Sequence, residues 1–325
     1  MSARWEELVP EALHDAVRAA FSSTYGNTPI ECLGAISGGA SGAVVLRVRS
    51  GAHAHLLRVE VRRLPMRNPH QYTCMAIAAE ARVAPALHYA NAEHGVALMD
   101  YVEQVPLARF PGGEAGLARA LGALAAQLQA APAFPAAGDW RAIVGRLVGH
   151  VETLCAPGLL DGHRAGYERL SAATPWDAAT HVPSHNDPNA RNLLFDGERV
   201  WLIDWEASYR NDPMIDVAIM ADNLAASPEL EAELLRAWLG RAADAGERHR
   251  LRQVQAMTRL YYAALLVALS GPQPGSIRDL AAPSRAEFEA AVLRGEHAPT
   301  SPATMLVLGK MQLAGFLEGL ARCEA

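Results

Sequence analysis

The pattern of apolar residues changes near residue 102, and this change constrains the fold more than any other feature of the sequence. Before it, helical spacing over 8–21 and 69–83 alternates with short strand-like runs at 31–36, 43–49, 54–61, 86–89 and 95–101. After it, alanine-rich helical periodicity dominates and is interrupted by prolines. The sequence therefore predicts an α+β fold with a small mixed lobe over 1–102 and a larger, mainly helical lobe over 103–325.

Composition excludes several classes of protein. The chain has 325 residues, is 50% hydrophobic and carries a formal net charge of -6 without a basic block, so we expect neither a nucleic-acid nor an anionic-membrane partner. The four cysteines show neither a Cys-x-x-Cys pair nor zinc-like spacing, which predicts four buried, reduced thiols. The N-terminal residues do not resemble a signal peptide, and no apolar run is long enough to span a membrane, so a cytoplasmic location is predicted.

Acidic residues are concentrated around a predicted hairpin. The segment 181–216 reads HVPSHNDPNARNLLFDGERVWLIDWEASYRNDPMID, and an Asp196-Gly197 turn joins the apolar runs 192–195 and 200–203. Such clustered acids could form a solvated surface. However, the apolar residues between them indicate buried strands, and metal ions or a cationic ligand would then be needed to neutralise the acids.

The hairpin predicts a magnesium site. It places Asn192 and Asp204 at neighbouring positions, where an amide oxygen and a carboxylate could share Mg²⁺. Asp187, in the loop before the hairpin, is then free to face a substrate and to accept the proton of an attacking hydroxyl. This set of groups is the one that phosphoryl transfer requires.

These motifs resemble the catalytic segment of aminoglycoside and choline kinases, which belong to the protein-kinase-like superfamily. The resemblance lies in His185-x-Asp187, in Asn192 five residues later, and in the sequence Ile-Asp-Trp-Glu that contains Asp204. It implies a two-lobe fold with an antiparallel sheet in the N-terminal lobe, ATP and Mg²⁺ as cofactors, Asp187 as catalytic base, and Asn192 and Asp204 as magnesium ligands. It also implies structural roles for His185, as a brace of the catalytic loop, and for Asp216, which would hold that loop from a helix start.

A glycine-rich segment between the first two predicted strands is a candidate phosphate-binding loop. Its small residues would let backbone amides approach phosphate oxygens, although an ordinary hairpin turn fits as well. The segment resembles the Gly-Gly-x-Ser loop of the same family and not a Walker loop, because no lysine follows it. The nucleotide-binding candidates in this segment are Ser37, Gly38, Gly39 and Ser41.

The third predicted strand should carry a cation for the nucleotide phosphates. Lys310 is the only lysine of the chain, so this role falls to an arginine, which can bind phosphate through two parallel hydrogen bonds. Arg58 is the candidate, with Arg62 and Arg63 as alternatives. Glu80, in the helix that follows, is expected to pair with Arg58, and Glu60 is its competitor.

Adenine is expected to bind where the two lobes join. The buried strand 96–99 runs into Asp100, Tyr101 and Val102, and by resemblance the backbone of Asp100 and Val102 would contact the base. Leu98 and Met99 are expected to be core residues.

The phosphoryl acceptor is predicted to be a small cationic molecule with a hydroxyl group. Acids beyond those needed for Mg²⁺ favour a positive charge, and Glu206 and Tyr209 are the candidate substrate contacts. Choline would need an aromatic cage, for which the rings are Trp205, Tyr209, Trp238, Tyr261 and Tyr262. Choline or ethanolamine is slightly favoured, while aminoglycosides and thiamine also fit.

Two other functions stay open at this point. A nucleotide-binding pseudokinase or an interaction protein without turnover would have the same fold, but the presence of Asp187, Asn192 and Asp204 argues for an enzyme. A protein kinase is disfavoured because the region after Asp204 is too short for an activation loop.

Overall fold

The computed structural model describes residues 4–36, 42–62, 68–298 and 301–324. Its residues pack into two compact units, each assembled from separate stretches of the chain. The first unit contains residues 1–137, 182–210 and 223–241, and the second contains residues 138–181, 211–222 and 242–325. The predicted lobe boundary after residue 102 stays a prediction.

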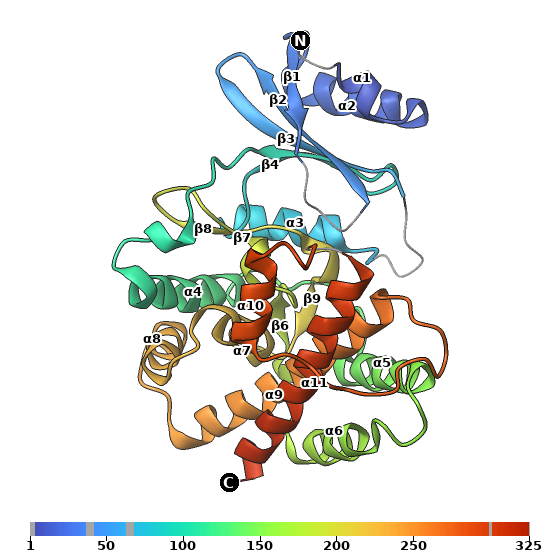
Figure 1. The fold of residues 1–325 in the computed structure, drawn as a ribbon. Coiled ribbons are helices and arrows are strands. Elements are labelled where there is room, and N and C mark those ends of the chain that lie inside the picture. Colours follow the sequence, from blue (N-terminus) through green and yellow to red (C-terminus); the bar gives the residue numbers. More distant parts are fainter. Residues whose placement is uncertain (1–3, 37–41, 63–67, 299–300, 325) are drawn as a thin grey trace. The chain divides into compact units, whose positions relative to one another are not determined.

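A five-stranded antiparallel sheet forms the N-terminal part of the first unit (Figure 1). The strand order is β1-β2-β3-β5-β4. The strands are β1 (Ile30–Ala35), β2 (Ala43–Ser50), β3 (His53–Glu60), β4 (Leu87–Asn91) and β5 (Val96–Asp100). These bounds agree with the five predicted runs to within one or two residues, which confirms the predicted antiparallel sheet.

One face of this sheet is covered by the N-terminal helices α1 (Trp5–Leu8) and α2 (His14–Tyr25). Alternation along each strand places apolar side chains on that face, where they form one buried cluster. The cluster joins Val17 and Phe21 of α2 to Leu46, Leu57 and Leu98 of the sheet. Helix and sheet therefore bury their apolar faces against each other.

Helices and short strands complete the first unit. The helices are α3 (Gln71–Glu80), α4 (Gly113–Gln129) and α8 (Pro228–Leu239). The strands are β6 (Val182–Ser184), which pairs with β9 (Tyr209–Asn211), and the hairpin of β7 (Leu193–Phe195) and β8 (Val200–Leu202). The hairpin follows the predicted turn, and Asp196 accepts hydrogen bonds from the backbone N–H groups of Glu198 and Arg199 within it.

Gly122 allows close contact between α4 and α8. A Cβ atom at this position would lie 2.2 Å from the carbonyl oxygen of Leu234 and 2.9 Å from the backbone nitrogen of Trp238. Both atoms belong to the backbone of α8, so they cannot move away by rotation about a side-chain bond. The two helix backbones therefore approach each other through this glycine.

We expect Gly122→Ala to lower the free energy of unfolding by about 1–3 kcal/mol, because α8 must shift to admit the methyl group. The better helix propensity of alanine offsets only part of this cost. Gly149→Ala is the matched control, since a Cβ there would meet only the guanidinium of Arg164 at 3.7 Å. Urea unfolding should show a lower midpoint for Gly122→Ala alone, and equal midpoints for both variants would contradict the contact.

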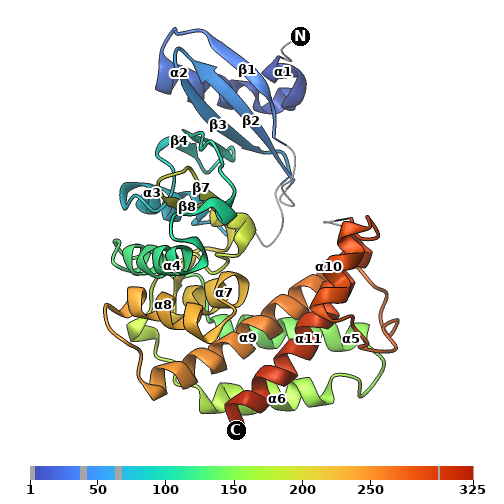
Figure 2. The same cartoon turned by 60° about the vertical axis from the view of Figure 1, so that its left-hand side comes forward.

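The second unit is helical. It contains α5 (Trp140–Leu154), α6 (Asp161–Ala173), most of α7 (Met214–Leu224), α9 (Ala245–Leu269), α10 (Arg285–Leu293) and α11 (Pro302–Glu324). The long helices α9 and α11 run side by side (Figure 2). Its polar contacts include an ion pair between Arg259 and Asp222, and Lys310 of α11 donates to Asp279 at 3.0 Å.

Helix starts in this unit follow the signals in the sequence. The Oδ1 atom of Asp212 accepts a hydrogen bond of 2.9 Å from the backbone N–H of Met214, as expected for an acidic cap before Pro213. Asp212 is fully buried and also pairs with Arg250.

No helix among the described residues is long and apolar enough to cross a membrane. The prediction of four buried thiols is wrong for Cys323, which is partly exposed near the end of α11, whereas the other three are buried.

Candidate active site

The loop after β6 is fixed by a buried histidine. The Nε2–H of His185 donates a hydrogen bond of 2.9 Å to the carbonyl oxygen of Ile203, and the imidazole lies edge-on to the ring of Trp205 at 4.7 Å between centroids. Burial lowers the pKa of His185 to about 4, so the ring is neutral at physiological pH. His185 therefore ties the start of the loop to the end of β8.

Two backbone positions of the site adopt left-handed conformations. Asn186 has φ +63° and Asp204 has φ +67°, and Arg82 is the other non-glycine residue with positive φ in the described part of the chain. Asparagine and aspartate tolerate this region better than other side chains do. The amide of Asn186 also donates to the carbonyl oxygens of Ala207 and Tyr209. Such backbone conformations often accompany functional sites, because surrounding contacts must hold them.

The carboxylate of Asp187 is oriented by two amides of the same loop. Oδ1 accepts a hydrogen bond of 2.8 Å from Asn189, and Oδ2 accepts one of 3.1 Å from Asn192. The Nδ2 group of Asn192 also donates to the backbone oxygen of Asp187 at 2.9 Å. Asp187 is partly exposed, so its carboxylate is held in place and still reachable by a ligand.

The hairpin brings Asn192 and Asp204 together. Leu193 pairs with Leu202 in the ladder, and the backbone N–H of Ile203 donates to the carbonyl oxygen of Asn192 at 3.0 Å. Asp204 is the next residue along the chain. Because Nδ2 of Asn192 is directed at Asp187, Oδ1 is the atom of this amide that could bind a cation. Asn192 and Asp204, which could supply an amide oxygen and a carboxylate, therefore lie at the same end of the hairpin.

Asp204 carries an unfavourable charge in this setting. Although the residue keeps an exposed surface, enough protein surrounds its carboxylate for desolvation to raise the pKa, and Arg58 only partly opposes this shift. A bound cation would stabilise the ionised form. The donors and their charge thus fit Mg²⁺, which prefers oxygen ligands.

Arg58 lies between two glutamates. It donates to Glu60 at 2.8 Å and forms a second ion pair with Glu206. Burial alone would lower the pKa of Arg58, but the nearby carboxylates, Glu206 foremost, raise it overall, so the guanidinium stays charged. Desolvation and the neighbouring charge of Asp204 raise the pKa of Glu206, while Arg58 lowers it. One arginine therefore faces three carboxylates.

Glu60 is the centre of a buried hydrogen-bond network. Its side chain is 6% exposed, and its Oε1 atom accepts hydrogen bonds from Arg58, from the Tyr72 hydroxyl at 2.9 Å and from the Gln71 amide. Gln71 and Tyr72 lie in the first turn of α3. This network links the third strand of the sheet to the helix that follows it.

The sequence profile of the phosphotransferase enzyme family matches residues 33–254, which is more than half of the chain. This chain belongs to the phosphotransferase enzyme family. The match includes the β6–β9 region with Asp187, Asn192 and Asp204, and the strand that carries Arg58. It confirms the predicted family and the predicted class of enzyme, a small-molecule phosphotransferase.

Solved structures of kinases share the fold. A choline/ethanolamine kinase family protein from Mesorhizobium loti is 20% identical, with a TM-score of 0.66 over 96% of this chain and 99% of that one. Choline kinase from Streptococcus pneumoniae is 13% identical, with a TM-score of 0.59 over 96% and 100% of the two chains. A spectinomycin phosphotransferase solved with ADP and spectinomycin is 13% identical, with a TM-score of 0.55 over 92% and 98%. The predicted α+β kinase-like fold is therefore confirmed.

Among curated proteins, an uncharacterized protein of Metamycoplasma hominis is 37% identical over 70 residues. The match covers 21% of this phosphotransferase and 14% of that protein, so the chain spans only a small part of the curated relative that it matches.

The structure corrects one predicted contact. Arg58 pairs with Glu60 and Glu206, whereas Glu80 is exposed at the end of α3. Residues two apart in a strand share a face, so Glu60 lies beside Arg58 without help from the helix. Glu60, the predicted alternative partner, forms the ion pair with Arg58. A role of Glu80 in nucleotide binding stays a prediction without this contact to support it.

Other predicted site residues have different surroundings. Ser37, Gly38, Gly39 and Ser41 lie outside the described residues. The N–H of Asp100 donates to the carbonyl oxygen of Ala86 at 2.9 Å, so a base could use the carbonyl oxygen of Asp100 and not its amide. Val102, in the segment after β5, is partly exposed. Their roles stay predictions.

Three further predicted residues are held by the protein itself. Asp216 is fully buried in the first turn of α7, in the second unit. Tyr209 is buried in β9, and its backbone oxygen accepts from Asn186. The Glu206 carboxylate is engaged by Arg58. The structural role of Asp216 and the acceptor contacts of Glu206 and Tyr209 therefore also stay predictions.

Sequence reasoning missed Asn186, Gln71 and Tyr72. Asn186 has a weak signal, since an asparagine directly before a predicted catalytic aspartate is one of the few side chains that accept a left-handed backbone. Gln71 and Tyr72 have no local signal, because their contact with Glu60 forms only when α3 packs against the sheet.

Proposed function

We propose that this phosphotransferase moves the γ-phosphoryl group of ATP to a hydroxyl group of a small cationic molecule, in a reaction that requires Mg²⁺. The observation that carries the proposal is the position of Asp187. Its carboxylate is fixed by Asn189 and Asn192, in a loop that leads directly to the hairpin ending at Asp204. We infer that this carboxylate acts together with oxygen ligands from Asn192 and Asp204, because phosphoryl transfer to an alcohol requires both a positioned base and a metal site.

Asp187 would accept the proton of the acceptor hydroxyl. Hydrogen bonds from two amides hold this carboxylate, and partial exposure lets a substrate reach it. Its backbone oxygen is bound by Asn192, which limits rotation of the loop. Orientation of the hydroxyl by this carboxylate is the principal contribution expected from the residue.

Asn192 Oδ1 and the carboxylate of Asp204 would hold Mg²⁺. When bound, the ion bridges phosphate oxygens and neutralises charge on the transferred group. The raised pKa of Asp204 supports this role, because a carboxylate that lacks solvation gains most from a cation. ADP in the spectinomycin phosphotransferase of the same fold supports a nucleotide cofactor.

Arg58 would contact the nucleotide phosphates by exchanging one of its carboxylate partners. The side chain of Glu206 is 37% exposed and that of Glu60 is 6% exposed, so Glu206 is the partner that solvent or phosphate could replace more easily. Arg58 would then stay anchored by Glu60. The carbonyl oxygen of Asp100 and the backbone of Val102 are the proposed contacts of adenine.

A cationic acceptor is supported by charge. Three carboxylates around one arginine leave excess negative charge in the first unit. Of the predicted cage rings, Tyr261 and Tyr262 belong to the second unit, where their rings lie 5.5 Å apart.

Two other predicted cage rings have structural contacts. Trp205 is buried against His185, and Trp238 donates to Gln129 of α4. Choline or ethanolamine remains slightly favoured because neighbours of the same fold carry these names. We further propose a cytoplasmic enzyme without nucleic-acid or membrane partners.

The test is Mg²⁺-dependent ATP consumption by the purified protein with choline, ethanolamine, thiamine, homoserine, sugars and several aminoglycosides. We expect one cationic alcohol to raise the rate well above background, with ADP and phosphorylated acceptor formed in equal amounts. Asp187→Asn serves as the control for contaminating ATPases. A neutral sugar as best acceptor would contradict the cationic class, while ATP binding without turnover across the panel would favour a pseudokinase.

A further inference from the structure

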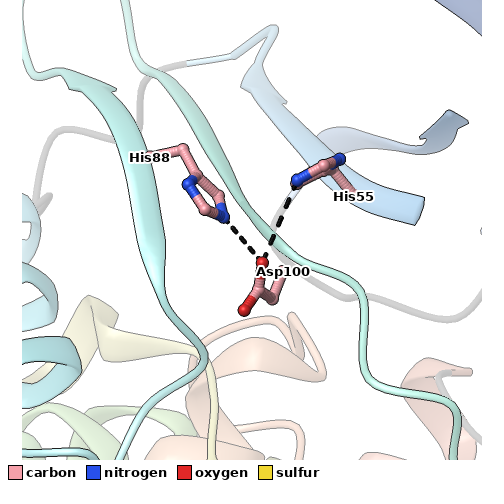
Figure 3. A group of neighbouring side chains, drawn as sticks. All are labelled: His55, His88 and Asp100. Carbon is pink, nitrogen blue, oxygen red and sulfur yellow. Dashed lines mark hydrogen bonds and ion pairs between the residues drawn. The ribbon is translucent and has the colours of Figure 1, made fainter. Parts of the chain in front are cut away.

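Three potential metal ligands from three strands converge at one end of the five-stranded sheet (Figure 3). They are His55 of β3, His88 of β4 and Asp100 of β5. Each offers one ligand atom, and the three atoms lie within 4.8 Å of one another. None of the three side chains has a role in the proposed phosphoryl transfer, for which only the backbone of Asp100 is used.

Strand register and a bulge create this convergence. His55 and Asp100 are direct partners across the β3–β5 ladder, so their side chains project from the same face. In β4 the register shifts between Leu87 and Tyr89, which makes His88 the extra residue of a bulge. A bulge redirects a side chain that regular alternation would place on the other face. His88 consequently points toward Asp100, as Figure 3 shows.

The distances suit one small ion. His88 Nε2 lies 2.6 Å and His55 Nε2 lies 4.0 Å from the same Oδ1 atom of Asp100. Ligands bound tetrahedrally to zinc at about 2.0–2.1 Å lie roughly 3.3 Å from one another. Small side-chain rotations that lengthen the first distance and shorten the second would create this geometry. The Nε2–H···Oδ1 hydrogen bond of His88 would give way to the ion, with the proton of that ring on Nδ1.

The cluster combines one fixed ligand with two that solvent can reach. His55 is 7% exposed and packs against the ring of Tyr25 at 5.2 Å, which restricts its orientation. His88 and Asp100 are exposed, with side-chain exposures of 34% and 51%, so an ion can enter from solvent. A fourth position would be left to water.

We propose that His55, His88 and Asp100 form a binding site for a divalent transition metal, with Zn²⁺ as the best-fitting ion. Two imidazoles and one carboxylate are typical zinc ligands, whereas Mg²⁺ prefers oxygen ligands only. The site is thus chemically distinct from the one at Asn192 and Asp204. An ion here would link β3, β4 and β5 at the point where β5 ends, and it would stabilise the sheet.

The test is a Zn²⁺ titration of the chelator-treated protein against a chromogenic competitor, in excess Mg²⁺ to occupy oxygen-ligand sites. We expect one Zn²⁺ per chain in the wild type, and an affinity at least about 10-fold lower in His88→Ala and in Asp100→Asn, since even indirect supports of a metal are worth 10- to 100-fold. Zn²⁺ should also raise the thermal midpoint of the wild type and not of these variants, because it binds only the folded site.

His94→Ala is the matched control, since His94 is an exposed histidine of the turn between β4 and β5 and lies outside the cluster. It should bind Zn²⁺ like the wild type. Circular dichroism without metal checks that all variants are folded, and Co²⁺ absorption bands that are lost in His88→Ala and kept in His94→Ala would identify His88 as a ligand. Equal Zn²⁺ affinities of His88→Ala, Asp100→Asn and the wild type would overturn the proposal and leave a hydrogen bond that joins β4 to β5.

Discussion

The Asp187→Asn variant is expected to show a kcat about 10²–10⁴-fold below that of the wild type, because an amide cannot accept the proton of the acceptor hydroxyl. The substitution preserves shape, and the new amide oxygen can accept one of the two hydrogen bonds that Asn189 and Asn192 donate to the carboxylate. Neither the metal ligands nor Arg58 changes. The affinity for Mg²⁺-ADP, measured by calorimetry, should therefore stay close to that of the wild type.

Glu198→Gln is the matched control for this prediction. It removes one negative charge from the exposed turn of the β7–β8 hairpin without touching the catalytic loop. We expect unchanged kcat for this variant. Wild-type turnover by Asp187→Asn would refute the assignment of the base, and a parallel loss of nucleotide affinity would instead indicate that Asp187 helps to bind the metal.

The Arg58→Met variant is expected to lose about 3–5 kcal/mol of unfolding free energy, because it removes the guanidinium that pairs with the buried carboxylate of Glu60. The hydrogen bonds from Gln71 and Tyr72 to Glu60 would remain, but neither donor carries a charge. A second substitution, Glu60→Gln, should restore much of the loss. Urea unfolding of the two single variants and the double variant gives the coupling energy.

The exposed pair of Arg49 with Glu31 provides the control for Arg58→Met. It joins the neighbouring strands β1 and β2, with side-chain exposures of 47% and 49%, so Arg49→Met should cost less than about 1 kcal/mol. Similar losses for Arg49→Met and Arg58→Met would show that the buried network around Glu60 does not stabilise the fold.

Acid should partly rescue Arg58→Met. Arg58 lowers the pKa values of Asp204 and Glu206, which desolvation raises, so its removal lets both rise further. A group whose pKa is higher in the folded state stabilises that state as the pH falls. The stability deficit relative to the wild type should therefore shrink between about pH 7 and about pH 5. A deficit independent of pH would mean that lost packing, and not unpaired charge, causes it.

Local sequence signals predicted most elements of this fold. The five strands of the sheet, the hairpin around Asp196 and Gly197, and the helix after Asp212 all have patterns contained within a few residues. The prolines after residue 130 correctly separated α4, α5 and α6. The short strands β6 and β9 were not predicted, because three residues are too few to show periodicity and their pairing joins segments about 25 residues apart.

The candidate site was predictable where its residues are close in sequence. The predicted hairpin placed Asn192 near Asp204, and the resemblance to the kinase segment added Asp187 in the loop before it. The predicted pairing of Arg58 with Glu80 is wrong, because Glu60 lies two residues further along the same strand and therefore on the same face as Arg58. The convergence of His55, His88 and Asp100 could not be predicted, because it depends on strand order and on a bulge that the sequence does not mark.

The single lysine also affects how this enzyme can be detected. Reagents that acylate amines near a bound nucleotide need a lysine in the phosphate site, and the residue of β3 that we propose for this site is Arg58, whose guanidinium stays protonated. Lys310, the one side-chain amine, lies on α11 and donates to Asp279. ATP analogues that carry lysine-directed probes should therefore fail to label this phosphotransferase in a proteome. An arginine-selective dicarbonyl reagent would be the appropriate choice for labelling it.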